Sequence, residues 1–459
     1  MMRFIERHKT ELIVFFLAIL ARMAFFFVCL YANGGNVENT IHGQDGYFDI
    51  SRNLLLGNGF SINQTPPFSP YSYGVPGYPF FLFFLLWATG SYAATAMIQL
   101  VLGAFIPVLG MYLSRLIVPT YDRAPLAVGI LLALAPYQIL FSFIFYTEVL
   151  FTALFGIFLI LFLNFLKTPS IRFAVLAGLF LGLATLTKPT VQYLAILAVV
   201  FAWWRLRSEV PRDILLKAGC FFLLFLTVLS PWVYRNYRTF NMINLGSQMP
   251  FNLYEVLLPS VLAIENQTSF AAEQQKLPVQ SADLYVNAPR SISRMAITEI
   301  SRHPVALVKL SALNAVTFFT HDGMLTFLQA AGVQRGAYIG KPALVLFLTA
   351  PLSFLKIARL YMHTIMASVF LGRLFWIAVT VLFGSGLYHL WRSGLFSAQV
   401  LFCMIVVVYF MLTTMINGLT VNARFRMPVE PIIFGVAYAG YFSIRHFRKN
   451  LKIDGNIHV

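Results

Sequence analysis

Long apolar runs recur along this sequence, and they restrict the possible folds more than any other feature. A helix that crosses a bilayer needs roughly 20 apolar residues, and we count about ten runs of suitable length. The predicted spans are residues 11–31, 92–116, 125–143, 148–166, 172–188, 190–204, 214–232, 366–390, 397–417 and 431–444. Because 59% of the 459 residues are hydrophobic and only 11% are charged, little chain remains for a soluble domain. The sequence predicts a single all-α, polytopic membrane domain over residues 1–459.

The positive charges follow the pattern that orients membrane proteins. If the N-terminus is cytoplasmic, every second loop carries lysine or arginine, as the positive-inside rule requires. No small-residue cleavage pattern follows the first run, Glu11 to Tyr31, so we expect a retained span. The net charge of +16 is spread over short loops and forms no patch, which argues against a nucleic-acid partner. We predict a multi-pass protein of the inner or plasma membrane with both termini cytoplasmic.

This orientation places two long loops outside the membrane, residues 32–91 and about 233–365. In the first loop, the apolar run from Pro76 to Ala88 is too short to span, so we expect a helix at the membrane interface. The second loop has amphipathic or apolar runs at about 291–318 and 343–361, which we also place at the interface. Both loops would contact membrane lipid from the outer side.

The first outer loop begins with an unusually polar stretch, GQDGYFDISRNLLLGNGFS, at residues 43–61. We predict a helix from Tyr47 to Leu56 that a Gly-Asn-Gly turn ends. Asp45 lies just before this helix, and Asp49 lies in its first turn. An aspartate in front of a helix can cap it, so capping is the alternative to a catalytic role for Asp45.

Glu148 is a third acid of interest. In FIFYTEVLF it stands between apolar residues, where an unpaired carboxylate costs several kcal/mol. It therefore needs a partner. The alternative is a place in the first turn of a helix that Thr147 caps.

Six positive side chains fall near the outer ends of predicted spans, where insertion topology does not explain them. They are Arg52, Lys188, Arg235, Arg238, Arg424 and Arg426. On a continuing helix, Arg235 and Arg238 would share a face and repel each other without an anion nearby. Arg424 and Arg426 would lie on one side if their segment is extended. A phosphate on a lipid tail would satisfy these cations, and contact with ordinary headgroups is the alternative.

Motifs in a specific order resemble the multi-spanning glycosyltransferases of the GT-C superfamily. These motifs are DISRNLLLGNGFS, PGYPFFLFFLL, YTEVLF, GLFLGLATLTKPT, SPWVYRNYRTF and ARFRMPVEPII. Together they extend over nearly the whole chain, each on the expected side of the membrane. Within that superfamily the sequence resembles bacterial relatives of the protein O-mannosyltransferases and of the lipid A aminoarabinose transferase.

The resemblance implies transfer of a sugar from a polyprenyl-phosphate donor to a hydroxyl group on the extracytoplasmic side. The acceptor would be an envelope lipid, glycan or protein. The resemblance also implies that Asp45 is the general base and that Glu148 orients the acceptor or the base. The residues that match basic positions of the family, at or near the carrier phosphate, are Arg52, Lys188, Arg235, Arg238, Arg424 and Arg426.

The same resemblance assigns a role to each part of the chain. The first outer loop, 32–91, would be catalytic, and the second, 233–365, would cover the donor and the acceptor. The C-terminal spans would run over residues 366–444, in one GT-C-type bundle with the rest.

One departure from the family concerns the general base. Relatives place the loop aspartate four residues before the helix tyrosine, whereas Asp45 is two residues before Tyr47 and Gly43 occupies the usual place. Asp49 is therefore the alternative base.

The proposed chemistry requires no cofactor. No Asp-x-Asp pair or His/Cys cluster demands a metal, although a carboxylate-bound divalent ion stays open. The rival function is a transporter or flippase of a lipid-linked or anionic substrate. Transporters place charges deep in their spans, whereas this chain concentrates them at the outer ends.

Overall fold

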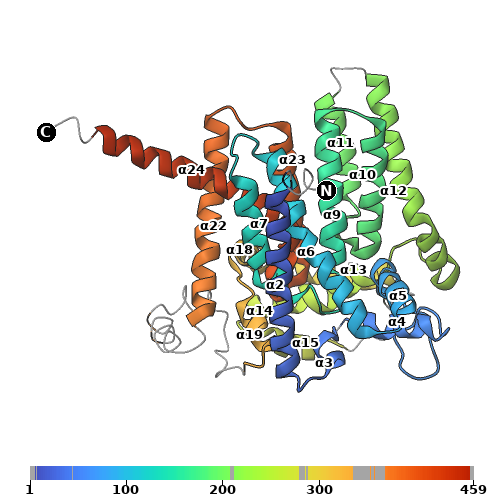
Figure 1. Cartoon of the computed structure of the whole chain (residues 1–459). Coiled ribbons are helices and arrows are strands. Elements are labelled where there is room, and N and C mark those ends of the chain that lie inside the picture. The colour runs from blue at the N-terminus through green and yellow to red at the C-terminus, as the bar shows by residue number, and fades with distance from the viewer. Residues whose placement is uncertain are drawn as a thin grey trace.

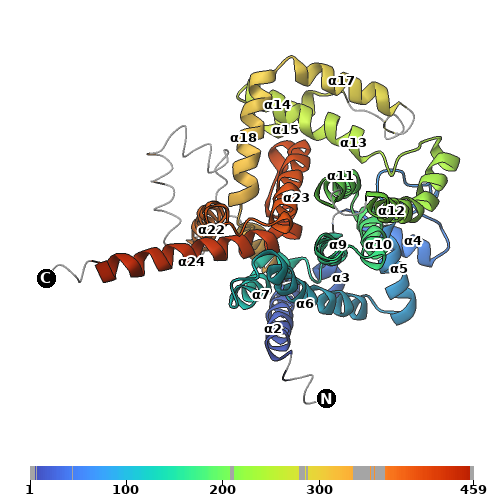
Figure 2. The same cartoon turned by 90° about the horizontal axis from the view of Figure 1, so that it is seen from above.

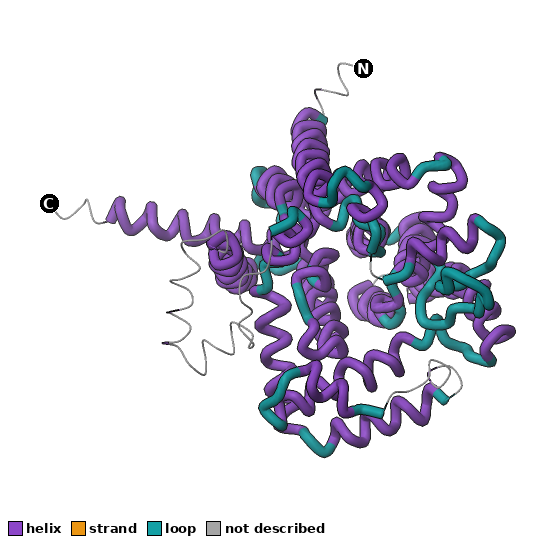
Figure 3. The backbone as a smooth tube through the Cα atoms, turned by 90° about the horizontal axis from the view of Figure 1, so that it is seen from below, coloured by secondary structure: helices purple, strands orange, loops and turns teal. Residues whose placement is uncertain are grey.

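The structure, a computed structural model, describes residues 6, 8–43, 45–206, 211–278, 285, 288–333, 352, 356 and 367–454. In this part of the chain every regular element is a helix (Figure 3). Eight segments are long and apolar enough to cross a membrane: Lys9–Ala32, Tyr92–Ile117, Glu148–Lys167, Pro189–Leu206, Arg212–Phe240, Ala367–Arg392, Ala398–Thr420 and Met427–Arg445. The predicted all-α polytopic fold is confirmed.

The long helices form two groups that stand side by side (Figures 1 and 2). One group consists of α9 (Glu148–Lys167), α10 (Ile171–Thr187), α11 (Leu194–Leu206) and α12 (Pro211–Phe240). The other consists of α2 (Lys9–Ala32), α6 (Tyr92–Ile117), α7 (Ala124–Leu134), α22 (Ala367–Arg392) and α24 (Glu430–Asp454). Helix α6 packs against α9 and joins the groups, and α23 (Ala398–Thr414) lies between α22 and α11 (Figure 2).

Two predicted spans are shorter than expected. The run at 125–143 divides into α7 and a short α8 (Pro136–Leu140), because the extended residue Ala135 before Pro136 ends the first helix. The run at 172–188 forms α10, whose 17 residues extend only about 26 Å. Among the described residues, eight of the ten predicted spans become long helices, and the other two become α10 and the pair α7 and α8.

Phenylalanines on α9 form the centre of the bundle. Phe151, Phe155, Phe158 and Phe162 recur every three or four residues, so they share one face, and each is at most 2% exposed. The ring of Phe162 packs against Phe402 of α23 with centroids 4.4 Å apart. This packing fixes α9 and, with it, the N-terminal end at which polar side chains gather.

The helices of the first predicted outer loop lie at the lower end of the bundle in Figure 1. They are α3 (Val37–Ile41), α4 (Tyr47–Leu55) and α5 (Gly77–Thr89). Helix α4 begins where the sequence predicts and ends one residue earlier. Helix α5 has 13 residues, about 20 Å, which is too short to cross a bilayer.

The second predicted outer loop also folds into helices, which curve along one edge of the bundle (Figure 2). They are α13 (Gln248–Phe251), the π-helix η2 (Asn252–Leu257), α14 (Leu258–Glu265), α15 (Phe270–Lys276), α17 (Pro289–Ser301), α18 (Pro304–Thr320) and α19 (Met324–Ala330). Leu253, Leu258 and Ile292 belong to a small hydrophobic core of their own. The run predicted at 343–361 lies outside the described residues, apart from positions 352 and 356.

An irregular segment leads from α23 into α24. It consists of three 3₁₀ turns, η3 (Met415–Thr420), η4 (Ala423–Phe425) and η5 (Met427–Val429). Helix α24 then crosses α22 closely. Gly386 permits this approach, since a Cβ atom at that position would lie 2.0 Å from the carbonyl oxygen of Val436. The crossing and the 3₁₀ turns together decide where the basic residues of this segment point.

Candidate functional site

Two glycines hold the loop that carries Asp45. A Cβ atom at Gly43 would lie 2.4 Å from the carbonyl oxygen of Phe145, so only glycine permits this close approach. Gly46 has a φ of 73°, which glycine adopts without strain. The backbone N–H of Phe145 donates to the carbonyl of Ile41 at 2.8 Å. These contacts bring Asp45 next to the turn that precedes α9.

Four charged residues meet at this point, and we call them the Asp45 cluster: Asp45, Glu148, Lys188 and Arg424. The ammonium of Lys188 donates to Glu148 at 3.0 Å, and the Nε of Arg424 donates to the same carboxylate oxygen. The other end of the Arg424 guanidinium donates to Asp45 at 2.8 Å. The prediction that Glu148 needs a partner is confirmed.

Exposure falls steeply across the Asp45 cluster. The side chain of Asp45 is 38% exposed, that of Arg424 is 22% exposed, and that of Glu148 only 2%. Burial opposes the charge of Arg424, but Glu148 and Asp45 outweigh it and raise the pKa of Arg424 above its ordinary value. The cluster therefore has a fixed, buried end and an accessible end at the Asp45 carboxylate.

Aromatic rings surround the two cations. The ammonium of Lys188 lies 5.4 Å from the ring centre of Phe425 and 5.8 Å from that of Phe151. The guanidinium of Arg424 lies 4.5 Å from the ring centre of Tyr146. Such rings attract cations and keep water away, which strengthens the electrostatic interactions of the cluster.

Three tyrosines lie close enough to Asp45 to respond to its charge. Burial raises the pKa of Tyr73 to about 12, and the Asp45 carboxylate acts in the same direction. Burial and the same carboxylate also raise the pKa of Tyr47 and of Tyr71. All three phenols therefore stay protonated, and they offer polar groups beside the accessible end of the cluster.

Arg235 holds the chain that carries two of these tyrosines. Its guanidinium donates to the carbonyl of Tyr71 at 3.1 Å and to the side chain of Asn236 at 2.9 Å. It also lies 4.6 Å from the ring centre of Trp232 on the same helix. Arg238, three residues further along α12, is exposed. The predicted span ended at residue 232, whereas α12 continues to Phe240 and carries both arginines.

Asp49 and Arg52 lie on α4 with other neighbours. Asp49 accepts a hydrogen bond from Gln64 at 3.2 Å, and Arg52 is exposed in the last turn of the helix. Among the described residues, the ion pairs that involve Glu148 come from Lys188 and Arg424 and not from α4. Of the two candidate bases, the structure brings Asp45 into the charged cluster.

Arg426 belongs to a different set of charges. The segment before α24 is not extended but forms 3₁₀ turns, so Arg424 and Arg426 point to different places. Arg426 is fully buried, with its guanidinium 3.4 Å from the ring centre of Trp376. It donates to the carbonyls of Phe318 and His321 at 2.5 and 2.7 Å. The interpretation of Arg426 as a phosphate contact beside Arg424 is thus corrected, because the turns carry it into the protein interior.

We call this second set the Arg426 cluster: His321, Asp322, Arg373, Arg426 and Glu430. Glu430 lies 3.5 Å from Arg426, one helical turn along the chain, and Asp322 pairs with Arg373 at 2.5 Å. Burial lowers the pKa of His321 to about 3, and the nearby Arg373 and Arg426 act in the same direction. The cluster ties the end of α18 to α22 and α24.

Sequence reasoning missed the pairing of Arg426 with Glu430 and the role of Arg22. The spacing of Arg426 and Glu430, four apart, was a readable signal for a pair on one helical turn. Arg22, inside the first span, was another, because an ionisable residue in a span needs partners. It donates to the Ser142 hydroxyl at 2.8 Å and to the carbonyl of Ala133, near the break between α7 and α8. Arg22 therefore stabilises a helix break.

The described residues contain no group of three or more His, Cys, Asp or Glu side chains that could hold a metal ion. Asp45 and Glu148 are the two carboxylates of the candidate site, and both are paired with Arg424. A divalent ion could bind between them only by displacing that guanidinium.

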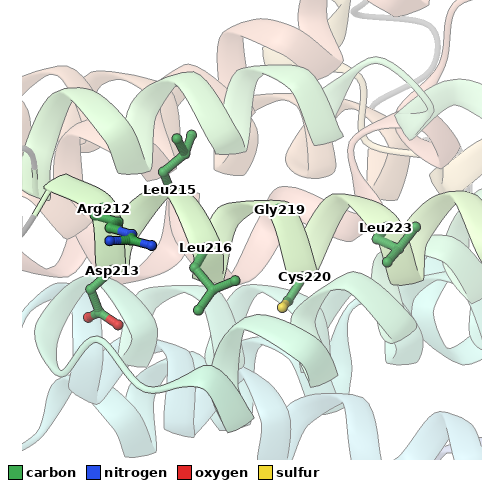
Figure 4. A pocket seen from close by; sticks show the side chains of 7 residues that line it. All are labelled: Arg212, Asp213, Leu215, Leu216, Gly219, Cys220 and Leu223. Carbon is green, nitrogen blue, oxygen red and sulfur yellow. The ribbon is translucent and has the colours of Figure 1, made fainter.

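A hollow of about 810 Å³ lies along the first half of α12 (Figure 4). Arg212 and Asp213 stand at one end of it, and Leu216, Cys220 and Leu223 continue along the helix. This is the opposite end of α12 from Arg235. The hollow therefore belongs to the apolar surface of the bundle and not to the charged site.

Comparisons with known proteins find few similarities. No model of a protein family matches the sequence, and no curated protein matches it either. Among solved structures, the chain is similar to the oligosaccharyltransferase of Archaeoglobus fulgidus in its apo form, with a TM-score of 0.48 and 15% identity. That alignment covers 95% of this chain and 52% of the other.

A structure of the same archaeal protein in complex with zinc and sulfate gives a TM-score of 0.49 at 15% identity. It covers 93% of this chain and 50% of that one. The chain thus spans about half the length of the proteins it resembles. Similarity at this level assigns no family, so the function has to be argued from the site.

Proposed function

We propose that this protein is a membrane glycosyltransferase of the GT-C type. It would transfer a sugar from a polyprenyl-phosphate donor to a hydroxyl group of an envelope lipid, glycan or protein on the extracytoplasmic side. The observation that carries the proposal is the Asp45 cluster. It combines an accessible carboxylate with two cations that a buried carboxylate holds in place. The motif resemblance found in the sequence supports the same reaction.

Asp45 is the proposed general base. A hydroxyl group is a weak nucleophile, and a carboxylate within hydrogen-bond reach takes its proton as the new bond forms. Asp45 is the most exposed member of its cluster, so an acceptor can reach it. Gly43 packs closely against the carbonyl oxygen of Phe145, and Gly46 leads the chain from Asp45 into α4.

Lys188 and Arg424 are the proposed contacts of the carrier phosphate. The phosphate gains negative charge as the sugar leaves, and cations held nearby stabilise that charge. Glu148 would orient both cations, because it accepts a hydrogen bond from each and is itself buried. The aromatic rings around them reduce the competing influence of water.

Tyr47, Tyr71 and Tyr73 would line the place for the sugar. Their phenols remain protonated beside Asp45, so they can both donate to and accept from sugar hydroxyls. In this scheme Arg235 positions the segment that carries Tyr71 and Tyr73, because it donates a hydrogen bond to the carbonyl of Tyr71. Arg238, Arg52 and the second outer loop would contact the carrier or the membrane surface.

The test is transfer by the purified protein in lipid, with a panel of polyprenyl-phosphate sugars and a crude envelope extract as acceptor. Asp45→Asn should lower turnover roughly 100- to 10,000-fold, because the general base is lost. Asp49→Asn is the matched control, and we expect less than a threefold change, roughly, because Asp49 lies outside the cluster.

Each outcome of this test decides between named alternatives. Loss of turnover in Asp49→Asn alone would move the base to α4. Absence of transfer and of donor hydrolysis in the wild type, for every donor, would favour a transporter of the lipid-linked substrate.

A further inference from the structure

The charges of the Asp45 cluster balance in the structure. Asp45 and Glu148 contribute two negative charges, and Lys188 and Arg424 contribute two positive charges. Every member has at least one ion-pair partner among the four. Both cations of the cluster are therefore already paired with its carboxylates when an anion arrives.

A phosphodiester that binds here needs a cation to change partner. The ion pair that breaks is the one whose loss costs the least free energy. Glu148 is 2% exposed, so removing its cations would leave a buried charge uncompensated, which is strongly unfavourable. Asp45 is 38% exposed, and water can replace the hydrogen bond that it accepts from Arg424.

The structure also restricts how Arg424 can move. The backbone N–H of Arg424 donates to the side chain of Asn422 at 3.0 Å, and Arg426, two residues later, is anchored in the interior. The backbone on either side is therefore held, and the movement falls to the side chain. The rings of Tyr146 and Phe141 lie 4.5 and 5.6 Å from the guanidinium, so it can turn while it stays over aromatic faces.

We propose that Arg424 masks Asp45 in the free protein and passes to the donor phosphate when the donor binds. Asp45 is then released as a base only after the lipid-linked donor is in place. Binding is consequently ordered, with the donor before the acceptor hydroxyl. This inference rests on the proposed function and adds to it the order of substrates and the residue that enforces it.

The experiment measures the chemical reactivity of Asp45 in the full chain. The protein in lipid is treated with a water-soluble carbodiimide and glycine ethyl ester, and labelling of the Asp45 peptide is read by mass spectrometry. The probe is polyprenyl phosphate without a sugar, so no turnover takes place, and native mass spectrometry of the same samples reports its binding. We expect labelling to rise roughly two- to fivefold when the lipid binds, because the ion pair to Arg424 is broken.

Variants separate masking from a general opening of the site. Arg424→Gln should give high labelling without the lipid and no further rise with it. Arg115→Gln, which removes an arginine paired with Glu11 in the last turn of α6, should behave as the wild type does. The wild-type comparison with and without lipid needs no variant to fold, so the proposal can be tested even if Arg424→Gln is unstable.

The possible results have distinct meanings. Labelling that stays constant or falls while the lipid is bound would overturn the proposal, and so would a failure of polyprenyl phosphate to bind. Sugar transfer without a rise in labelling would leave the glycosyltransferase function standing and reject the masking role. A rise in labelling without transfer of any sugar would support the exchange of partners and reject the reaction.

Discussion

The Asp45 cluster and the Arg426 cluster use the same kinds of side chain and reach very different environments. Their arginines are two residues apart, yet Arg424 is 22% exposed and Arg426 has no exposed surface. In the first cluster a carboxylate faces an accessible space. In the second, Arg426 is occupied by main-chain carbonyls, by Glu430 and by the ring of Trp376.

The difference shows how one short segment can serve both architecture and chemistry. Burying a charge is unfavourable unless partners surround it, and then removal of one partner is strongly destabilising. Such a group fixes helices in place but cannot meet a substrate. A charge that keeps some exposure contributes less to stability and remains free to exchange partners. The Arg426 cluster anchors the 3₁₀ turns before α24. This anchoring fixes the backbone of Arg424, which belongs to the Asp45 cluster.

The largest expected effect concerns the stability of the Arg426 cluster. Arg426→Met should lower the free energy of unfolding by about 3–5 kcal/mol, because Glu430 is left buried without its cation. Arg424→Met is the matched control. Its free energy of unfolding should fall much less, since Lys188 still compensates Glu148 and Asp45 is accessible to water. Thermal unfolding in detergent micelles measures both.

A second variant checks the cause of that loss. Adding Glu430→Gln to Arg426→Met should recover part of the lost stability, because the uncompensated charge disappears. Equal losses in Arg424→Met and Arg426→Met would contradict the distinction between the two clusters.

The next effect concerns the use of the donor. Lys188→Met should lower kcat/KM for the lipid-linked donor roughly tenfold, which corresponds to about 1.4 kcal/mol, because one proposed phosphate contact is lost. The fold should persist, since Arg424 still pairs with Glu148.

Lys217→Met is a suitable control for that measurement. Lys217 is a lysine of similar burial that pairs with Asp213, near the far end of α12 from Arg235. Donor kinetics that are unchanged in Lys188→Met, or reduced equally in both variants, would argue against a phosphate site at Lys188.

The third effect is a dependence of stability on pH. The pKa of His321 is about 3 in the folded protein and about 6.5 in an unfolded chain, so its contribution to stability is full above pH 6.5 and is lost as the pH falls toward 3. Between pH 7 and pH 5 we expect a loss of roughly 1–2 kcal/mol from this group.

His321→Asn should reduce that acid sensitivity, because asparagine does not titrate and keeps an acceptor for the N–H of Gly323. Burial also raises the pKa of Asp322, which acts in the opposite sense at low pH, so the informative quantity is the difference between variant and wild type. Melting temperatures at pH 7 and pH 5 supply it. Identical acid sensitivity in the two proteins would show that His321 is not held neutral.

Much of the architecture was predictable because bilayer thickness sets the length of an apolar helix. Eight predicted spans appear as long helices, and α4 begins at the predicted Tyr47. The failures were local. Pro136 shortens α7 through its effect on the preceding residue, and the sequence pattern alone did not separate one long apolar run from two short helices.

The sequence by itself determined the class of protein, the order of its helices and the need of Glu148 for a partner, because these follow from hydropathy and from the cost of an unpaired charge. Which partner it takes was decided only by the tertiary structure. Lys188 and Arg424 are 40 and 276 residues away from Glu148 along the chain, and no local periodicity links positions so distant. Likewise, only the 3₁₀ turns before α24 separate Arg424 from Arg426, because a backbone turn decides on which side of a helix bundle a long side chain is placed.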